Sequence, residues 1–190
     1  MKVLFLHLSD MHFVSDSSYT KKDCEEIANA VAAKIICPIS MIFLVLSGDI
    51  AFSGGAEEYN EAEKFVGELQ ASILGKVEID KEKIKVLLVP GNHDRQYPED
   101  RPDREDYESV LSRRKDEELK TYIDREFSMQ KNFFEFLKRE ECPYGESEKF
   151  LQRKVIEHEG FSFEFNLLNT APMSLLDADD RGLHYLPDDV

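Results

Sequence analysis

The chain has 190 residues, a length that corresponds to one domain. Its hydrophobic content of 42% and charged content of 33% are typical of a folded globular protein and exclude a disordered or fibrous one. The formal net charge of −15 disfavours nucleic-acid backbones and anionic membranes as partners, and no apolar run approaches the ~18 residues of a membrane span.

Three short apolar runs predict buried strands at residues 3–8, 41–46 and 86–89. Each run shows little alternation, which is typical of a strand buried on both faces, and each ends at a polar turn. Because helices are expected between the runs, the strands should be joined by right-handed crossovers into a parallel sheet. The three polar turns should then lie together at the carboxyl edge of that sheet.

Two amphipathic helices are predicted between these strands. The first follows the capping candidate Thr20 and is ended by Pro38, and the second is ended by Gly75. Apolar residues recur at helical spacing in both, at Ile27, Ala28, Val31, Ala32, Ile35 and Ile36 and at Tyr59, Ala62, Phe65, Val66, Leu69 and Ile73.

The chain changes character after Asp94. Residues 95–150 read as a charged and helical insertion, in which apolar residues between Leu119 and Leu137 predict one long amphipathic helix with packing aromatics. Residues 161–167 alternate strictly and predict a half-buried antiparallel strand. We therefore expect residues 1–190 to form a single domain that carries this insertion.

The cysteines are Cys24, Cys37 and Cys142, an odd number without the paired spacing of a metal site. This usage indicates free thiols in a reducing compartment. A cytoplasmic location is expected.

The polar turns carry residue types that bind metal ions. Asp10 and His12 are two positions apart, and on an extended strand end such positions project to the same side. Asp49 has a carboxylate able to bridge two cations, Asn92 offers a neutral oxygen, and His93 can donate a proton or contact a phosphate. Mixed Asp, His and Asn ligation suits Mn²⁺, Fe or Zn²⁺. Each turn alone has an ordinary structural explanation, so it is their conjunction at one sheet edge that predicts a metal site.

The order Asp-x-His at 10–12, Gly-Asp at 48–49 and Gly-Asn-His-Asp at 91–94 resembles the calcineurin-like metallophosphoesterases. The resemblance is close to about residue 94 and looser at 168–170 and 179–182, and residues 53–59 are similar to the cyclic-nucleotide phosphodiesterase-like branch. It implies an α/β fold, a β-sandwich flanked by helices in four α/β/β/α layers, incomplete here at the C-terminus.

The resemblance also implies roles for the five polar residues. Asp10 and His12 would bind one of two divalent ions (Mn, Fe or Zn), Asp49 would bridge both, and Asn92 would bind the second. His93 would be the catalytic residue, as general acid or as stabiliser of the phosphoryl oxygens. A hydroxide bridging the two ions would attack phosphorus in line.

Two other residues, Asp94 and Arg181, have two interpretations each. Asp94 could orient His93 or cap an ordinary turn. Arg181 could approach a phosphate or lie in a surface turn, and the surface turn is the expectation. The later histidines, His158 and His184, stand outside the Gly-His-x-His pattern of the family. The remaining family ligands are therefore absent from this sequence. We expect the chain to be the amino-terminal part of a longer protein, with an incomplete site that is inactive alone.

The leading functional hypothesis is a metal-dependent phosphohydrolase that acts on a small phosphodiester, such as a cyclic nucleotide. A nuclease of the same superfamily is a second reading, which the net charge disfavours. A non-catalytic scaffold on the same fold is a third. The missing histidines favour the scaffold, and the five retained polar residues count against it.

Overall fold

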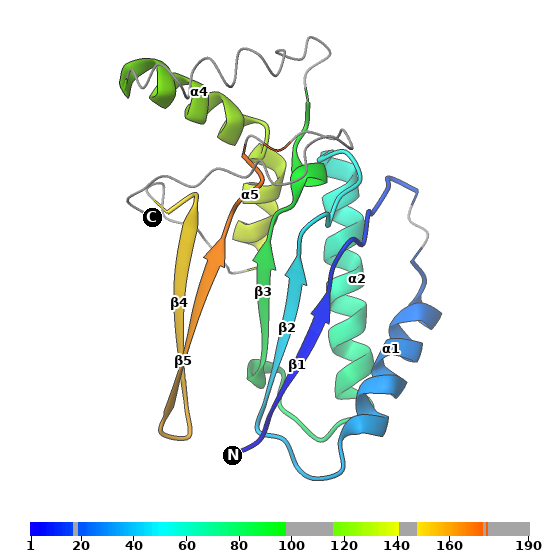
Figure 1. The fold of residues 1–190 in the computed structure, drawn as a ribbon. Coiled ribbons are helices and arrows are strands. Elements are labelled where there is room, and N and C mark those ends of the chain that lie inside the picture. The colour runs from blue at the N-terminus through cyan, green and yellow to red at the C-terminus, as the bar shows by residue number, and fades with distance from the viewer. Residues whose placement is uncertain (17–18, 98–115, 141–147, 173, 175–190) are drawn as a thin grey trace.

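The computed structural model describes residues 1–16, 19–97, 116–140, 148–172 and 174. Figure 1 shows the elements in chain order, from the amino-terminal strand to the last hairpin. Their bounds are β1 Val3–Leu8, α1 Lys21–Lys34, β2 Met41–Ser47, α2 Ala56–Leu74, the 3₁₀ turn η1 Lys81–Lys83, β3 Ile84–Val89, the 3₁₀ turn η2 Asn92–Asp94, α4 Asp116–Ser128, α5 Lys131–Arg139, β4 Leu151–His158 and β5 Phe161–Leu168.

Strands β1, β2 and β3 form a parallel sheet in that order, as predicted. Their arrowheads point the same way in Figure 1, so the turns that follow them lie at one edge. The expectation of burial on both faces holds for β2, the central strand. It is wrong for β1, whose Phe5 is 53% exposed because β1 is an edge strand in the described part of the chain.

Helices α1 and α2 cover one face of this sheet. Thr20 begins α1 as predicted, through a capping box in which the Thr20 side chain accepts from the Asp23 N–H. The predicted apolar stripe extended two residues beyond α1, which ends at Lys34. Ile35 still packs against the core, whereas Ile36 is 92% exposed. Among the described residues, no helix has the length and apolar character needed to cross a membrane.

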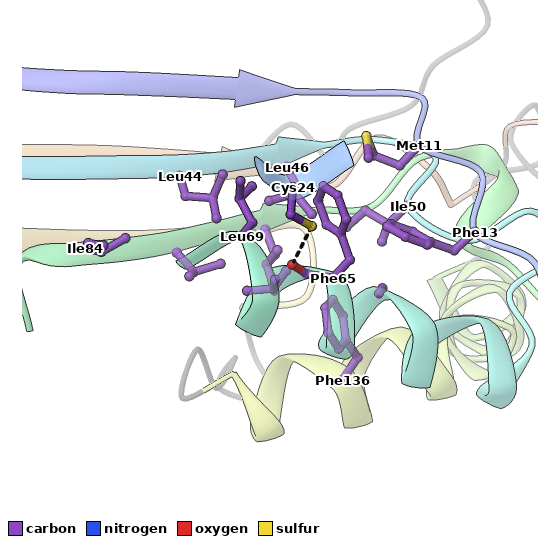
Figure 2. Close-up of a cluster of buried hydrophobic side chains, with 14 of the residues drawn as sticks. Met11, Phe13, Cys24, Leu44, Leu46, Ile50, Phe65, Leu69, Ile84 and Phe136 are labelled. Atoms are coloured by element: carbon purple, nitrogen blue, oxygen red, sulfur yellow. Dashed lines mark hydrogen bonds between the residues drawn. The ribbon is translucent and has the colours of Figure 1, made fainter. Parts of the chain in front are cut away.

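The main core lies between the sheet and these helices (Figure 2). Phe13 packs its ring against Phe65, with ring centroids 5.3 Å apart. The thiol of Cys24 contacts the Phe65 carbonyl at 3.8 Å, so α1 and α2 are joined inside the core. The segment that follows β1 is packed against this core.

The second face of the sheet is covered by the antiparallel hairpin β4–β5. Phe43 of β2 packs against Phe163 and Phe165 of β5, with ring centroids 5.2 and 4.8 Å apart. The antiparallel strand predicted at 161–167 is confirmed, whereas β4 was not predicted. The described elements thus form helix, sheet and sheet layers, a mixed α/β architecture consistent with the expected sandwich.

The single long helix predicted between Leu119 and Leu137 is wrong, because α4 and α5 are separate. The Ser128 hydroxyl donates to the Arg125 carbonyl at 2.6 Å and so competes with the helical hydrogen bonds at the end of α4. Helix α5 then packs on α2, where Phe136 stacks on Tyr59 with centroids 5.4 Å apart. Part of the expected insertion therefore belongs to the main core.

Candidate metal centre

The turns after β1, β2 and β3 are joined by backbone hydrogen bonds. The Asp10 N–H donates to the Gly48 carbonyl at 3.1 Å, and the His12 N–H donates to the Asp49 carbonyl at 2.9 Å. The Gly48 N–H donates to the Val89 carbonyl at 2.8 Å. These bonds continue the parallel pairing past the strand ends, so the three turns form one connected surface at the carboxyl edge of the sheet.

The backbone of this surface is strained at the predicted site residues. Asp10, His12 and Asp49 have φ values of 54°, 48° and 51°, and only Glu159 among the other described non-glycine residues also has a positive φ. Left-handed backbone costs about 1–2 kcal/mol per residue and is often found at functional sites. The expected extended geometry of Asp10 and His12 is therefore wrong, since both residues adopt the left-handed conformation.

His12, Asp49 and His93 each present a potential ligand atom, and these atoms lie within 4.8 Å of one another. The rings of His12 and His93 meet edge to face, with centroids 4.5 Å apart. A carboxylate oxygen of Asp49 accepts from the His93 N–H at 3.0 Å, which holds the turns after β2 and β3 together. Two imidazoles and one carboxylate form a donor set that suits Mn²⁺, Fe or Zn²⁺.

The hydrogen bonding of the two imidazoles fits metal ligation. The Nδ1 atom of His12 is buried and has no hydrogen-bond partner among the described residues. Nδ1 of His93 lies 2.7 Å from the Phe52 carbonyl, an acceptor, so Nδ1 carries the proton and Nε2 keeps its lone pair. Both rings therefore have a nitrogen available for a cation.

Asp10 and Asn92 flank this cluster without being part of the three converging groups. Asp10 is exposed and lies one residue before Met11, which is buried in the core. Asn92 begins η2, and its backbone carbonyl accepts from the Tyr97 hydroxyl at 3.4 Å. The roles of Asp10 and Asn92 as metal ligands stay predictions.

Gly91 lets the turns after β2 and β3 approach each other. A Cβ atom at this position would overlap the backbone nitrogen and Oδ1 of Asp49 and would lie 2.9 Å from its Cγ. Real Cβ atoms essentially never show such separations. The glycine of the third motif is therefore required by the position of Asp49.

The Asp94 carboxylate is completely buried beneath the cluster. It accepts hydrogen bonds from the backbone N–H groups of Ile50 at 3.0 Å, Ala51 at 2.8 Å and Gly91 at 2.8 Å, and from the Tyr59 hydroxyl at 2.9 Å. Burial raises the pKa of Asp94 to about 6, against the opposing effect of these four donors. Of the two readings left open, these contacts favour the structural one. These contacts hold together the turns that carry Asp49 and His93.

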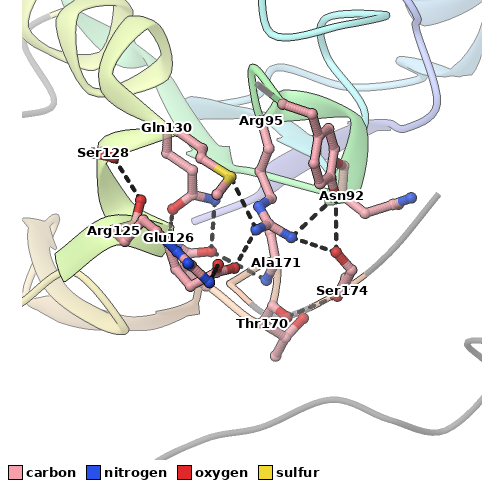
Figure 3. Close-up of polar contacts among 12 residues, drawn as sticks. Asn92, Arg95, Arg125, Glu126, Ser128, Gln130, Thr170, Ala171 and Ser174 are labelled. Carbon is pink, nitrogen blue, oxygen red and sulfur yellow. Dashed lines mark hydrogen bonds and ion pairs between the residues drawn. The ribbon is translucent and has the colours of Figure 1, made fainter. Parts of the chain in front are cut away.

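Arg95 fixes the segment that follows the third motif (Figure 3). Its guanidinium forms an ion pair with Glu126 of α4, and both side chains are only 2% exposed. The same guanidinium donates to the Ser174 carbonyl and, at 3.0 Å, to the Tyr97 hydroxyl. Residues beside the site are thus joined to α4 and to the chain beyond β5.

Asn169, in the loosely matched segment 168–170, is fully buried and has a structural role. Its amide nitrogen donates to the Gln130 side chain at 2.8 Å and to the Lys149 carbonyl at 3.0 Å. The chain after β5 is therefore attached to the turn between α4 and α5.

The later histidines do not complete the cluster in the described part of the chain. His158 ends β4 and, with Lys83, lines a cavity of about 890 Å³ at the start of β3, at the other end of the sheet from the site. His184, Arg181 and the segment 179–182 lie outside the described residues.

Sequence reasoning did not find two contacts made with residues of this site. Tyr59 was predicted on the apolar face of α2 and at the end of the segment 53–59, without the contact that its hydroxyl makes with Asp94. Phe52 was not assigned at all, although its carbonyl contacts His93. Helical spacing explains the burial of Tyr59 but not its hydrogen bond, and no pattern around Phe52 indicated a contact 41 residues away.

Comparison with known proteins agrees with this geometry. The family model described as calcineurin-like phosphoesterase matches residues 3–186, which include all three motifs. No curated protein matches the chain. The chain therefore belongs to the calcineurin-like phosphoesterase family, whose members are metal-dependent phosphoester hydrolases.

Proposed function

We propose that this protein hydrolyses small phosphodiesters at the edge of the sheet where His12, Asp49 and His93 converge. The observation that carries the proposal is the placement of three potential ligand atoms within 4.8 Å of one another on the motif-bearing turns. In this proposal His12 and Asp49, together with Asp10 and Asn92 on the same turns, would hold two divalent cations, and His93 would face the substrate. Divalent cations, when bound, supply Lewis-acid charge and promote the ionisation of water.

The residues of the chain have distinct tasks in this proposal. One oxygen of Asp49 is fixed by the His93 N–H, and the remaining lone pairs of the carboxylate are available to bridge cations. The Phe52 carbonyl fixes the ring of His93, whose Nε2 then contacts the ester and, when protonated, donates to the leaving oxygen. Asp94 and Gly91 keep the two turns at the separation that these contacts need.

The charge of the chain supports a diester substrate over a monoester. At neutral pH a phosphodiester carries one negative charge, whereas a phosphomonoester carries about 1.5 to 2. A chain with a net charge of −15 repels the monoester more strongly at long range. The same charge disfavours the nuclease reading, because a nucleic-acid backbone is a dense array of negative charges.

A reducing, cytoplasmic compartment is part of the proposal. Cys24 and Cys37 are both free thiols, which is the state expected where disulfides do not persist.

The test is hydrolysis by the full-length protein, stripped of metal and then supplied with Mn²⁺, Fe²⁺ or Zn²⁺. We expect metal-dependent cleavage of bis(p-nitrophenyl) phosphate at a higher kcat/KM than p-nitrophenyl phosphate. The Asp49→Asn variant should lose at least about 100-fold in kcat. Equal rates for this variant and the parent protein would exclude the assigned site. Metal binding without any hydrolysis would favour the scaffold reading.

A further inference from the structure

Phe52 presents an aromatic ring to solvent immediately beside the two histidines. The side chain is 52% exposed, and its ring centroid lies 6.0 Å from that of His12 and 5.7 Å from that of His93. The ring belongs to neither of the hydrophobic clusters of the described chain. Its place is therefore not explained by packing of the core.

The backbone of Phe52 is held on both sides. Its N–H donates to the Phe13 carbonyl at 3.0 Å, and its own carbonyl contacts Nδ1 of His93 at 2.7 Å. The preceding residue, Ala51, is buried and donates its N–H to the Asp94 carboxylate at 2.8 Å. An exposed ring on so constrained a backbone presents an apolar surface at the side of the site.

We propose that Phe52 determines specificity by packing against a planar aromatic group of the ester, an inference that rests on the proposed function. Aromatic rings attract one another at centroid separations of about 4.5–7 Å, in offset or edge-to-face arrangements. An aryl group is bonded to phosphorus directly or through one oxygen, so a phosphoryl group beside His12 and His93 brings its ring into that range. A nucleobase supplies the same planar surface at the greater reach of a sugar.

The test measures binding to the metal-loaded full-length protein by calorimetry, so that it does not depend on turnover. The probes are methylphosphonate, phenylphosphonate and adenosine 5′-monophosphate. The variants are Phe52→Ala and Phe52→Tyr, which keeps a ring. Phe161→Ala is the matched control, because Phe161 is similarly exposed, at 55%, at the start of β5.

We expect Phe52→Ala to weaken binding of an aromatic probe about 10-fold, to leave methylphosphonate binding unchanged, and to be rescued in Phe52→Tyr. A loss confined to phenylphosphonate identifies an aryl ester, and a loss that includes the nucleotide identifies a nucleobase. Equal weakening of all three probes, or of none, overturns the inference. So does an equal loss in Phe161→Ala.

The outcomes separate this inference from the proposed function. Ring-dependent binding without any phosphodiester hydrolysis would remove the proposed activity and leave the aromatic specificity standing. Phosphodiester hydrolysis, with probe binding that does not depend on the Phe52 ring, would support the proposed activity and remove the aromatic specificity. Failure of the parent protein to bind any of the three probes overturns the inference, while the hydrolysis assay decides the proposed function separately.

Discussion

Gly91 lies so close to Asp49 that an added methyl group would overlap both the backbone nitrogen and the carboxylate of that residue. The two residues belong to different motifs, one after β2 and one after β3. Only a glycine fits at this position. The close approach of the two turns allows the backbone N–H of His93 to donate to the Asp49 carboxylate.

Replacement of Gly91 by alanine should push Asp49 out of place. We expect Gly91→Ala to destabilise the fold by about 3 kcal/mol, as overpacking does, and to abolish metal-dependent hydrolysis. Urea unfolding and the hydrolysis assay measure the two effects. Gly67→Ala in α2 is the control, since nothing lies within 4 Å of an added Cβ there. It should stabilise by about 0.5–1 kcal/mol, and an equal effect of the two substitutions would contradict the steric account.

The contacts of the buried Asp94 carboxylate predict that two substitutions lower the stability of the fold by different amounts. Asp94→Asn turns an amide group toward backbone donors, so we expect a loss of about 3 kcal/mol in the free energy of unfolding. Tyr59→Phe removes only one donor and should cost about 1 kcal/mol. Chemical denaturation at pH 7 measures both. A larger loss for Tyr59→Phe than for Asp94→Asn would show that the carboxylate is not the centre of this network.

The parallel sheet was predictable because each of its strands is a continuous apolar run that ends at a polar turn. The site region was predictable for the same reason, since the carboxyl ends of parallel strands meet at one edge. The break between α4 and α5 was not, because the apolar spacing continues across it. It depends on the Ser128 hydroxyl and on the buried pair of Gln130 with Asn169, which joins residues 39 positions apart.

Local geometry at the site was also beyond sequence reasoning. The left-handed backbone of Asp10 and His12 is held by hydrogen bonds to the turn after β2, which no local pattern encodes. Strand β4 escaped prediction because polar residues, Arg153 and Lys154 among them, interrupt its apolar pattern. Its hairpin turn has a positive φ at both Glu159 and Gly160, a geometry typical of a two-residue hairpin loop.

The ion pair between Arg95 and Glu126 predicts a non-additive double-mutant cycle. Arg95→Met alone removes the closest cation from the buried Glu126 carboxylate, whose contact with Arg125 is longer, at 4.0 Å, so we expect a loss of about 3–5 kcal/mol in the free energy of unfolding. The double variant, with Arg95→Met and Glu126→Met, should recover much of the lost stability, because burying two charged groups has a desolvation cost even when they are paired. Thermal and urea unfolding measure the stability of the parent protein, the two single variants and the double variant.

An exposed pair provides the comparison for that cycle. Lys138 contacts Glu135 at 2.9 Å with both side chains at least half exposed, and Lys138→Ala should change stability by less than about 0.5 kcal/mol. Additive effects of the two Met substitutions at Arg95 and Glu126 would refute coupling across the pair.

The two described cysteines should differ in reactivity. Burial, with further contributions from Glu68 and Asp23, raises the pKa of the Cys24 thiol to about 11, whereas Cys37 is half-buried. At pH 8 Cys24 is therefore almost entirely protonated, and the thiolate is the reactive form. In a Cys37→Ser, Cys142→Ser variant, Ellman's reagent should react slowly at pH 8, then faster as the pH rises toward 11 or when urea is added. Immediate reaction of the folded variant at pH 8 would contradict the burial of Cys24.

The most direct measurement of the central claim is calorimetric titration of Mn²⁺ into the metal-free, full-length protein, beside its Asp49→Asn variant. Asp80→Asn is the control, because Asp80 precedes η1 at the other end of the sheet and pairs with Lys83 at 2.8 Å. We expect two ions per chain for the parent and for Asp80→Asn, and at least about a 10-fold loss of affinity in Asp49→Asn. Unchanged affinity and stoichiometry in Asp49→Asn would show that the converging residues are not the metal centre.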